Sequence, residues 1–493
     1  MTAEESTQTC NDNEKCLYVL FPGIAMSLGW GLRGYIGGGP FGAMIPGCMV
    51  ALTLCLLLRQ SGSLAALAAL FGAIGVGFGG QMTYGQTIGF IIKSETFWWG
   101  FTGLTLKGAV WGLLGGAMIG IGLNYRNYLP KDVVIALVLL ILASFIGWKL
   151  INEPKLIYFS DPINKPRGES WAGLLLGAIV LIGYLKFRAR SQTACLPLRF
   201  ALWGALAGSI GFGGGGIWMA IGPNLSVNQQ WYPWWKFMEF SFGLCFGIGL
   251  GLCTFYNRQY LDCGKQTDSP TEFLWKQVLL GIFVVAFVFW LWPAFVHFIS
   301  SAISSEVSEM AVRQVLRSIL RVFFGFTTLG VLLVLLGMAV KSLRWHIVIT
   351  VTYCAAAIDL IEDMFGENSI NADPVFLWGF VIVSTLVVAV LVIFCEKRAK
   401  SPLAALFLLI TWACMFVSFP KAIIRHAIIY PAPGAIAEAG GLFIYLINTL
   451  KGQIVVHTIF TLEAIILTWI VCGPVRKIYA DMKACDDNST ENT

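Results

Sequence analysis

The sequence has few charged residues, and this shortage excludes most classes of soluble protein. Only 12% of its 493 residues are Asp, Glu, Lys or Arg, about half of the roughly 25% that is usual in soluble domains. Hydrophobic residues make up 57%, which is more apolar surface than a soluble chain of this length can bury. A disordered chain, a nucleic-acid-binding protein and a secreted disulfide scaffold are therefore excluded.

The common catalytic and metal-binding motifs are also missing. None of the 13 cysteines forms a Cys-x-x-Cys pair, and the chain has no G-K-S/T, no H-E-x-x-H and no nucleophile elbow. Cysteines inside apolar runs, such as Cys48 and Cys354, are predicted to be small buried hydrophobes. We therefore expect no metal and no cofactor, and catalytic residues are not assigned.

Long apolar runs, bounded by charges or turn residues, recur along the whole chain. They predict an all-α, polytopic integral membrane protein with about 14 transmembrane helices, within a range of about 12 to 15. Lys and Arg gather in the loops that lie on one side if both termini are cytoplasmic, as the positive-inside rule requires. The polar N-terminus has no basic segment before the first apolar run, so we expect no cleaved signal peptide. We expect a plasma or bacterial inner membrane location.

Four regions follow from these runs. Polar cytoplasmic tails are predicted at residues 1–16 and 476–493. Residues 17–261 form a glycine-rich membrane half, and residues 262–475 form a second membrane half. The second half contains an amphipathic segment at 301–320, which is predicted to lie along the membrane interface, and an acidic helix at 347–366.

The first half carries a glycine-rich repeat. Glycine accounts for 54 of the 493 residues. This share of about 11% exceeds the usual share of about 7%. The strings GAIGVGFGG at 72–80 and GALAGSIGFGG at 204–214 each open a helical hairpin that continues into a second glycine-rich helix. These matches predict parallel copies at 63–123 and 200–256, and a weaker copy at 17–58.

Three glycine runs in these hairpins are predicted to break their helices. Each glycine costs about 1 kcal/mol relative to alanine in a helix, and non-helical backbone inside a membrane must be buried or line a watery cavity. Residues 37–39, 77–80 and 211–216 are therefore candidates for a substrate path, with close helix packing as the alternative. The regular row Gly108, Gly112, Gly116 and Gly120 is predicted to serve packing.

Ionisable side chains at membrane depth are costly and mark possible binding sites. Arg33 follows the first glycine motif and suits a carboxylate, phosphate or sulfate; an interfacial role is the alternative. Lys107 and Glu239 occupy comparable places in two hairpins, where they could pair or face a cavity. The predicted substrate-binding residues are Arg33, Gln81, Tyr84, Lys107, Gly213, Gly214, Trp218 and Glu239.

The second half carries an acidic cluster. Asp359, Glu362 and Asp363 are spaced to share one helical face, where they would bind a cation or share protons. The alternative is that the helix ends near Leu360 and the acids lie in an outside loop. In the last span His457 and Glu463 are six residues apart and so face different sides.

These features predict a secondary transporter of a small polar or anionic organic solute, coupled to a proton or cation. Its partners would be that solute and the lipid bilayer. Two alternatives remain open: a membrane-embedded enzyme acting on a lipid-linked or amphiphilic substrate, and a non-catalytic channel or subunit.

Overall fold

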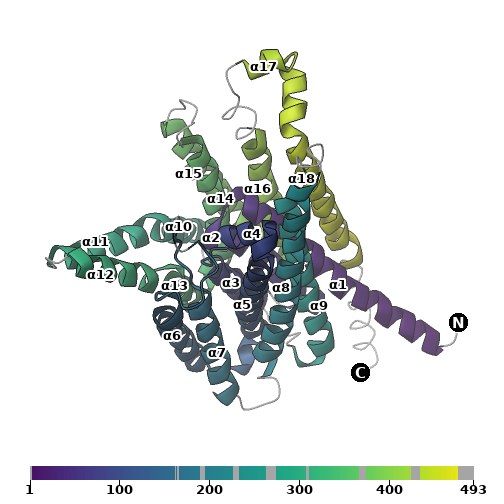
Figure 1. The fold of residues 1–493 in the computed structure, drawn as a ribbon. Coiled ribbons are helices and arrows are strands. Elements are labelled where there is room, and N and C mark those ends of the chain that lie inside the picture. The colour runs from purple at the N-terminus through teal and green to yellow at the C-terminus, as the bar shows by residue number, and fades with distance from the viewer. Residues whose placement is uncertain are drawn as a thin grey trace.

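The protein is an assembly of helices, and the described part of the chain contains no strand (Figure 1). The computed structural model describes residues 3–60, 62–161, 163, 166–188, 195–225, 232–261, 274–306, 310–365, 374–423 and 434–475. Thirteen helices within these residues are long and apolar enough to cross a membrane. The prediction of a helical, multi-pass membrane protein is therefore supported, whereas the exact count of spans stays a prediction.

Six helices of the glycine-rich half form a closed ring at the centre of the molecule (Figure 1). Each packs along two neighbours, in the order α1, α2, α3, α5, α8, α9 and back to α1. The sequence segments 17–58, 63–123 and 200–256 supply these helices as three hairpins, although the repeat itself stays a prediction. The six are α1 (Ala3–Ile36), α2 (Gly39–Leu58), α3 (Gly62–Gly79), α5 (Phe97–Leu123), α8 (Leu196–Ile221) and α9 (Trp234–Asn257).

Glycines bring the backbones of neighbouring hairpins into contact. A Cβ atom on Gly112 of α5 would lie 1.9 Å from the carbonyl oxygen of Gly204 on α8. A Cβ on Gly251 of α9 would lie 1.8 Å from the carbonyl oxygen of Tyr18 on α1, and one on Gly47 of α2 would lie 2.4 Å from that of Gly72 on α3. No side chain fits at these positions, so small residues set the helix spacing.

The other helices surround the ring. Their order and bounds are α4 (Gly85–Ile92), α6 (Pro130–Gly147), α7 (Trp171–Arg188), α10 (Leu274–Ala286), α11 (Trp292–Glu306), α12 (Met310–Phe323), α13 (Phe326–Ala339), α14 (Thr352–Phe365), α15 (Pro374–Arg398), α16 (Pro402–Ile423), α17 (Ala435–Glu438) and α18 (Leu442–Ile470). Short π-helical turns extend α6 to Asn152 and α18 to Val475, join α10 to α11, and precede α14.

The region around residues 301–340 differs from the sequence expectation. The predicted segment at 301–320 is shared between the end of α11 and most of α12, and these two helices form a hairpin that projects sideways from the bundle (Figure 1). That the amphipathic segment lies along the membrane interface stays a prediction. The following apolar helix, α13, is shorter than a spanning helix. The physical reason is Gly325, which is extended and forms the N-cap of α13, so the apolar run is divided into two helices.

The predicted helix breaks are only partly correct. Gly37 and Gly38 are non-helical, and Gly37 has a φ of 158° and Gly39 a φ of 70°. The helix α3 continues to Gly79 and then turns. The predicted break at 211–216 is wrong, because α8 runs without interruption from Leu196 to Ile221. Its glycines pack against α9 and α5, and this packing offsets their low helix propensity.

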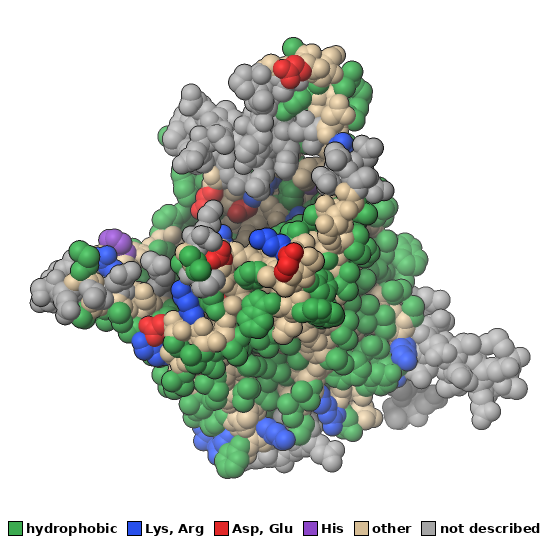
Figure 2. Space-filling model, viewed as in Figure 1, with side chains coloured by type: hydrophobic (Ala, Val, Ile, Leu, Met, Phe, Trp, Pro, Cys, Tyr) green, Lys and Arg blue, Asp and Glu red, His purple; other side chains and the backbone are tan. Residues whose placement is uncertain are grey.

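The first turns of α1 and the last turns of α18 both lie toward the lower right of Figure 1. Blue Lys and Arg side chains also gather along the lower edge of the molecule in Figure 2. This arrangement agrees with two termini on one side; that the side is cytoplasmic stays a prediction from the positive-inside rule.

Candidate functional site

Arg33 lies near the upper end of α1, inside the ring, and its side chain is only 3% exposed. Its Nη1 donates a hydrogen bond to the hydroxyl of Tyr84. The guanidinium carbon lies 5.5 Å from the ring centroid of Trp30, 5.3 Å from that of Tyr84 and 5.2 Å from that of Trp111. Such cation–π contacts stabilise a charge that is removed from water.

Two features leave Arg33 able to bind an anion. Its Nε is buried and has no hydrogen-bond partner in the described structure. No carboxylate of a described residue forms an ion pair with it. A buried donor without an acceptor costs about 1–3 kcal/mol, and more when it is charged, so a bound carboxylate or phosphate would lower the free energy of this group.

The first turns of α9 place a second cation and a carboxylate beside Arg33. Lys236 Nζ lies 2.6 Å from Glu239 Oε2 and donates to the carbonyl oxygen of Gly31 at 3.2 Å. Trp235 Nε1 donates to Glu239 Oε1 at 2.9 Å. A Cβ on Gly34 would lie 2.0 Å from that same carboxylate oxygen, so only glycine admits Glu239 against α1.

Tyr84 connects Arg33 to Glu239. It precedes α4 in the loop after α3, and its hydroxyl interacts with both charged groups. Burial raises the pKa of the Tyr84 phenol, and the Arg33 guanidinium opposes that rise. The phenol therefore stays protonated at neutral pH and can accept a hydrogen bond from Arg33 while it donates one to Glu239.

A third cation comes from the outer helices. Lys421 of α16 is buried and forms an ion pair with Asp359 of α14. Both Arg33 and Lys421 lie close enough to Lys236 to repel its charge. Three cations are thus gathered against two carboxylates, Glu239 and Asp359. The excess positive charge favours an anionic ligand.

The site lies beneath exposed residues on its upper side and is closed below. Gly34, Gly38, Gly85 and Trp235 beside it are exposed, whereas Arg33 and Glu239 are buried. Figure 2 shows a hollow with charged side chains on the upper side of the molecule. Below Arg33 the interior of the ring is filled by aromatic rings, with Trp30 at 4.4 Å from Phe242 between centroids. We call this feature the Arg33 recess: Trp30, Arg33, Tyr84, Trp111, Lys236 and Glu239.

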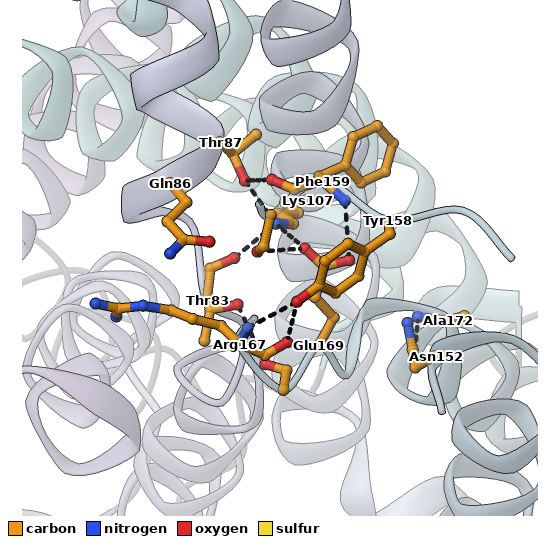
Figure 3. Close-up of polar contacts among 12 residues, drawn as sticks. Thr83, Gln86, Thr87, Lys107, Asn152, Tyr158, Phe159, Arg167, Glu169 and Ala172 are labelled. Atoms are coloured by element: carbon orange, nitrogen blue, oxygen red, sulfur yellow. Dashed lines mark hydrogen bonds and ion pairs between the residues drawn. The ribbon is translucent and has the colours of Figure 1, made fainter. Parts of the chain in front are cut away.

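Lys107 belongs to a different network, drawn in Figure 3. Its Nζ lies 3.1 Å from Glu169 Oε1 and donates to the Thr83 carbonyl oxygen at 2.6 Å and to Thr87 Oγ1 at 2.7 Å. Both side chains of the ion pair are 1% exposed. The Glu169 carboxylate also accepts from Ser160 Oγ at 3.0 Å. The ion pair fastens the chain between α6 and α7 onto α4 and α5, and Lys107 does not pair with Glu239.

The remaining predicted substrate residues lie away from the recess. Gln81 Nε2 donates to Thr327 Oγ1 at 2.8 Å, beside a separate cavity of about 200 Å³ that Glu169 also lines. A Cβ on Gly213 would lie 2.3 Å from Thr105 Oγ1, and Gly214 faces open space. Trp218 is 42% exposed on the outer face of α8. The structure therefore brings Arg33, Tyr84 and Glu239 together and leaves the other five outside.

The acidic helix is longer than the alternative interpretation allowed. The helix α14 continues to Phe365, so it does not end near Leu360. Asp359 is paired with Lys421, Glu362 is exposed, and the side chain of Asp363 lies outside the described residues. Among the residues described, no group of three or more His, Cys, Asp or Glu is placed to hold a metal ion.

Sequence reasoning missed three charged residues of these networks. Lys236 precedes Glu239 by three residues, a spacing typical of helical ion pairs, and so could have been found. Lys421 and Glu169 carry no such signal, because their partners are 62 residues away in the chain.

Comparison with known proteins gives no relative: no family model, no curated protein and no solved structure matches the chain.

Proposed function

We propose that this protein is a membrane transporter that binds a small organic anion in the Arg33 recess. The observation that carries the proposal is Arg33 itself, which is buried among three aromatic rings and has an Nε without a partner. A guanidinium whose faces are covered by rings offers its edge to a ligand, and a carboxylate fits that edge with two parallel hydrogen bonds.

The placement of the recess supports transport rather than simple anchoring. It lies inside the ring, and the rings of Trp30, Trp111 and Phe242 close the path beneath it. A site that is open on one side and sealed on the other is one state of an alternating-access cycle. If both termini are cytoplasmic, this state opens to the outside.

Two charged residues of the surrounding helices give the site a movable part. Lys421 and Asp359 belong to α16 and α14, which lie outside the ring, whereas Lys236 and Glu239 belong to a ring helix. Movement of the outer helices against the ring would change the positive charge that an anion meets. Such bundle movement around a fixed site is the usual mechanism of secondary transport.

The test uses benzoate as a probe anion and methyl benzoate as its neutral analogue. Benzoate should raise the melting temperature of the purified protein, because a ligand that binds the folded state stabilises it, and methyl benzoate should not. Arg33→Lys should weaken benzoate binding by about 10- to 150-fold, the loss of a charge-assisted hydrogen bond worth about 1.5–3 kcal/mol. Uptake into proteoliposomes should fall in parallel.

Arg344 provides the matched control. It is a buried arginine between α13 and α14. Its Nε donates to the Gly337 carbonyl oxygen at 2.8 Å, and its Nη1 donates to the Ser63 carbonyl oxygen at 2.9 Å. Arg344→Lys should lower stability and leave benzoate affinity unchanged. Equal benzoate affinity in wild type and Arg33→Ala would contradict the proposed site. Chemical conversion of an amphiphilic probe without net uptake would instead favour an enzyme.

A further inference from the structure

A buried carboxyl group in α18 is not part of the recess. Glu463 lies near the middle of the membrane-spanning segment Leu450–Val475, and its Oε2 is buried without a hydrogen-bond partner. Its carboxyl group interacts with the hydroxyl of Ser27 on α1, and Ser27 is itself 3% exposed. The carboxyl end of Glu463 therefore faces the ring, while the residue as a whole is half-buried.

No cation balances Glu463 in the described part of the chain, where every ion pair involves other residues. Its own helix also carries Tyr445, Lys451 and His457. The titratable and charged groups of the helices near it are Glu4, Glu5, Cys10, Asp12, Glu14, Lys15, Cys16, Tyr18, Arg33 and Tyr35 on α1, Cys414 and Lys421 on α16, and Lys236, Glu239, Cys245, Cys253 and Tyr256 on α9.

An ionised carboxylate at the membrane centre without a cation costs at least about 2.5–3.5 kcal/mol. The neutral carboxylic acid avoids this cost, and the Ser27 hydroxyl can donate a hydrogen bond to the carboxylate or accept one from the acid. Such a group binds a proton when it can reach water and carries it, as a neutral acid, through the membrane. Asp359 is less suited to this task, because Lys421 neutralises it directly.

The helix α18 connects Glu463 to the recess. His457 lies six residues earlier, which is about 9 Å along the helix axis. Its ring lies 5.1 Å from that of Tyr35, and Lys236 Nζ lies 5.5 Å from the Tyr35 ring. Between them, Phe460 packs on Phe240 of α9 at 5.6 Å. A shift of α18 against α1 would therefore change both the contact at Glu463 and the wall of the recess.

We propose that Glu463 is the proton-binding residue that couples anion transport to a proton gradient. The step is a reversible proton transfer: the carboxylate forms one O–H bond as a hydronium ion on the side to which the recess opens loses its proton and becomes water, and the acid later gives the proton to water on the other side. One proton then accompanies one monoanion, so that the cycle moves no net charge. This inference rests on the proposed transport function.

The first test needs no substrate. Infrared difference spectroscopy of the reconstituted protein during a pH titration should show the C=O stretch of a protonated carboxyl that is absent from Glu463→Gln. Glu438→Gln, which alters an exposed carboxyl on α17, is the control and should keep the band. Ser27→Ala, which is a milder change at the same contact, should move the pH at which the band appears. An unchanged band in Glu463→Gln would overturn the inference.

The second test separates this inference from the proposed function. With benzoate as probe, an inward proton gradient should raise the initial uptake of wild-type proteoliposomes several-fold. Glu463→Gln should lose this acceleration while benzoate exchange across the membrane at equal pH continues. A normal gradient effect in Glu463→Gln would exclude Glu463 but leave the transporter intact. If wild-type protein shows the infrared band but supports neither benzoate uptake nor benzoate exchange, the proposed transport function is contradicted. The coupling role of Glu463 would then be contradicted with it.

Discussion

The ring helices and the outer helices are packed in different ways. In the ring, 94% of the most apolar window of α2 and 89% of that of α3 is buried, against 39% for α15 and 39% for the last span. The contrast does not hold for every helix: the window of α8 in the ring is 50% buried, and that of the outer segment Lys341–Glu362, which contains most of α14, is 83% buried. Ring helices meet backbone to backbone through glycines such as Gly112 and Gly204, whereas the outer helices expose large apolar side chains such as Phe394 and Trp469. These backbone contacts leave the ring little freedom to rearrange, whereas α15 and α18 are the outer helices with the least buried apolar windows.

The recess lies at the boundary between these two regions. Arg33, Lys236 and Glu239 are held by ring helices, whereas Lys421 and Asp359 come from outer helices. Glu463 lies on an outer helix and faces a ring helix. Under the proposed transport function, the ring would fix the guanidinium and the outer helices would adjust the local charge, as alternating access requires.

The largest effect is expected from breaking the ring. Gly112→Leu would force a side chain into the carbonyl of Gly204, which lies 1.9 Å from the position of its Cβ. Since a backbone atom cannot move aside as a side chain can, we expect a loss of more than about 4 kcal/mol and no monodisperse peak in size-exclusion chromatography. Gly214→Leu, on the neighbouring helix but facing open space, should fold normally. Normal folding of both variants would show that the ring is not rigid.

The packing of the glycine row was predictable from sequence, whereas the continuity of α8 through residues 211–216 was not. Four glycines spaced four apart fall on one helical face, so the sequence itself indicates a packing surface. The structure agrees, because a Cβ added to Gly116 would lie 2.2 Å from the Phe200 carbonyl oxygen. The run at 211–216 has a low helix propensity, but contacts with Met238 and Cys245 keep it helical. Tertiary packing of this kind is not visible in a local pattern.

The candidate site could be predicted only in part for a similar reason. Arg33 and Tyr84 are polar residues next to glycine motifs, so the sequence marks them individually. Their placement together, and the separation of Lys107 from Glu239, depend on long-range contacts. These contacts set the path of the chain between α6 and α7 and the position of α16. The pairs Lys107–Glu169 and Lys421–Asp359 therefore emerge only from the fold.

A smaller effect is expected from the ion pair that fastens the chain between α6 and α7. Lys107→Met removes the cation from Glu169 and leaves a carboxylate that is 1% exposed, a change that typically costs about 3–5 kcal/mol. Adding Glu169→Gln should recover part of this loss, because the uncompensated charge disappears. The nearby pair Lys149–Glu153, with side chains 45% and 29% exposed, is the control: Lys149→Met should cost no more than about 1 kcal/mol. Thermal unfolding in one detergent measures all three, and equal losses for the two lysines would contradict a buried ion pair.

The smallest effect concerns the boundary itself. Asp359→Asn keeps the size of the side chain but removes the carboxylate that faces Lys421, so the recess gains one unit of positive charge beside Lys236. We expect benzoate to bind a few-fold more tightly in this variant, because added positive charge attracts an anion more strongly, and the gain should shrink at high salt. Glu362→Gln, on the exposed face of α14, should leave the affinity unchanged. Weaker benzoate binding in Asp359→Asn would mean that the carboxylate itself contributes to the site, as expected if Asp359 binds a coupling cation. Calorimetric titration of benzoate at two salt concentrations distinguishes these outcomes, because only the electrostatic gain in affinity depends on ionic strength.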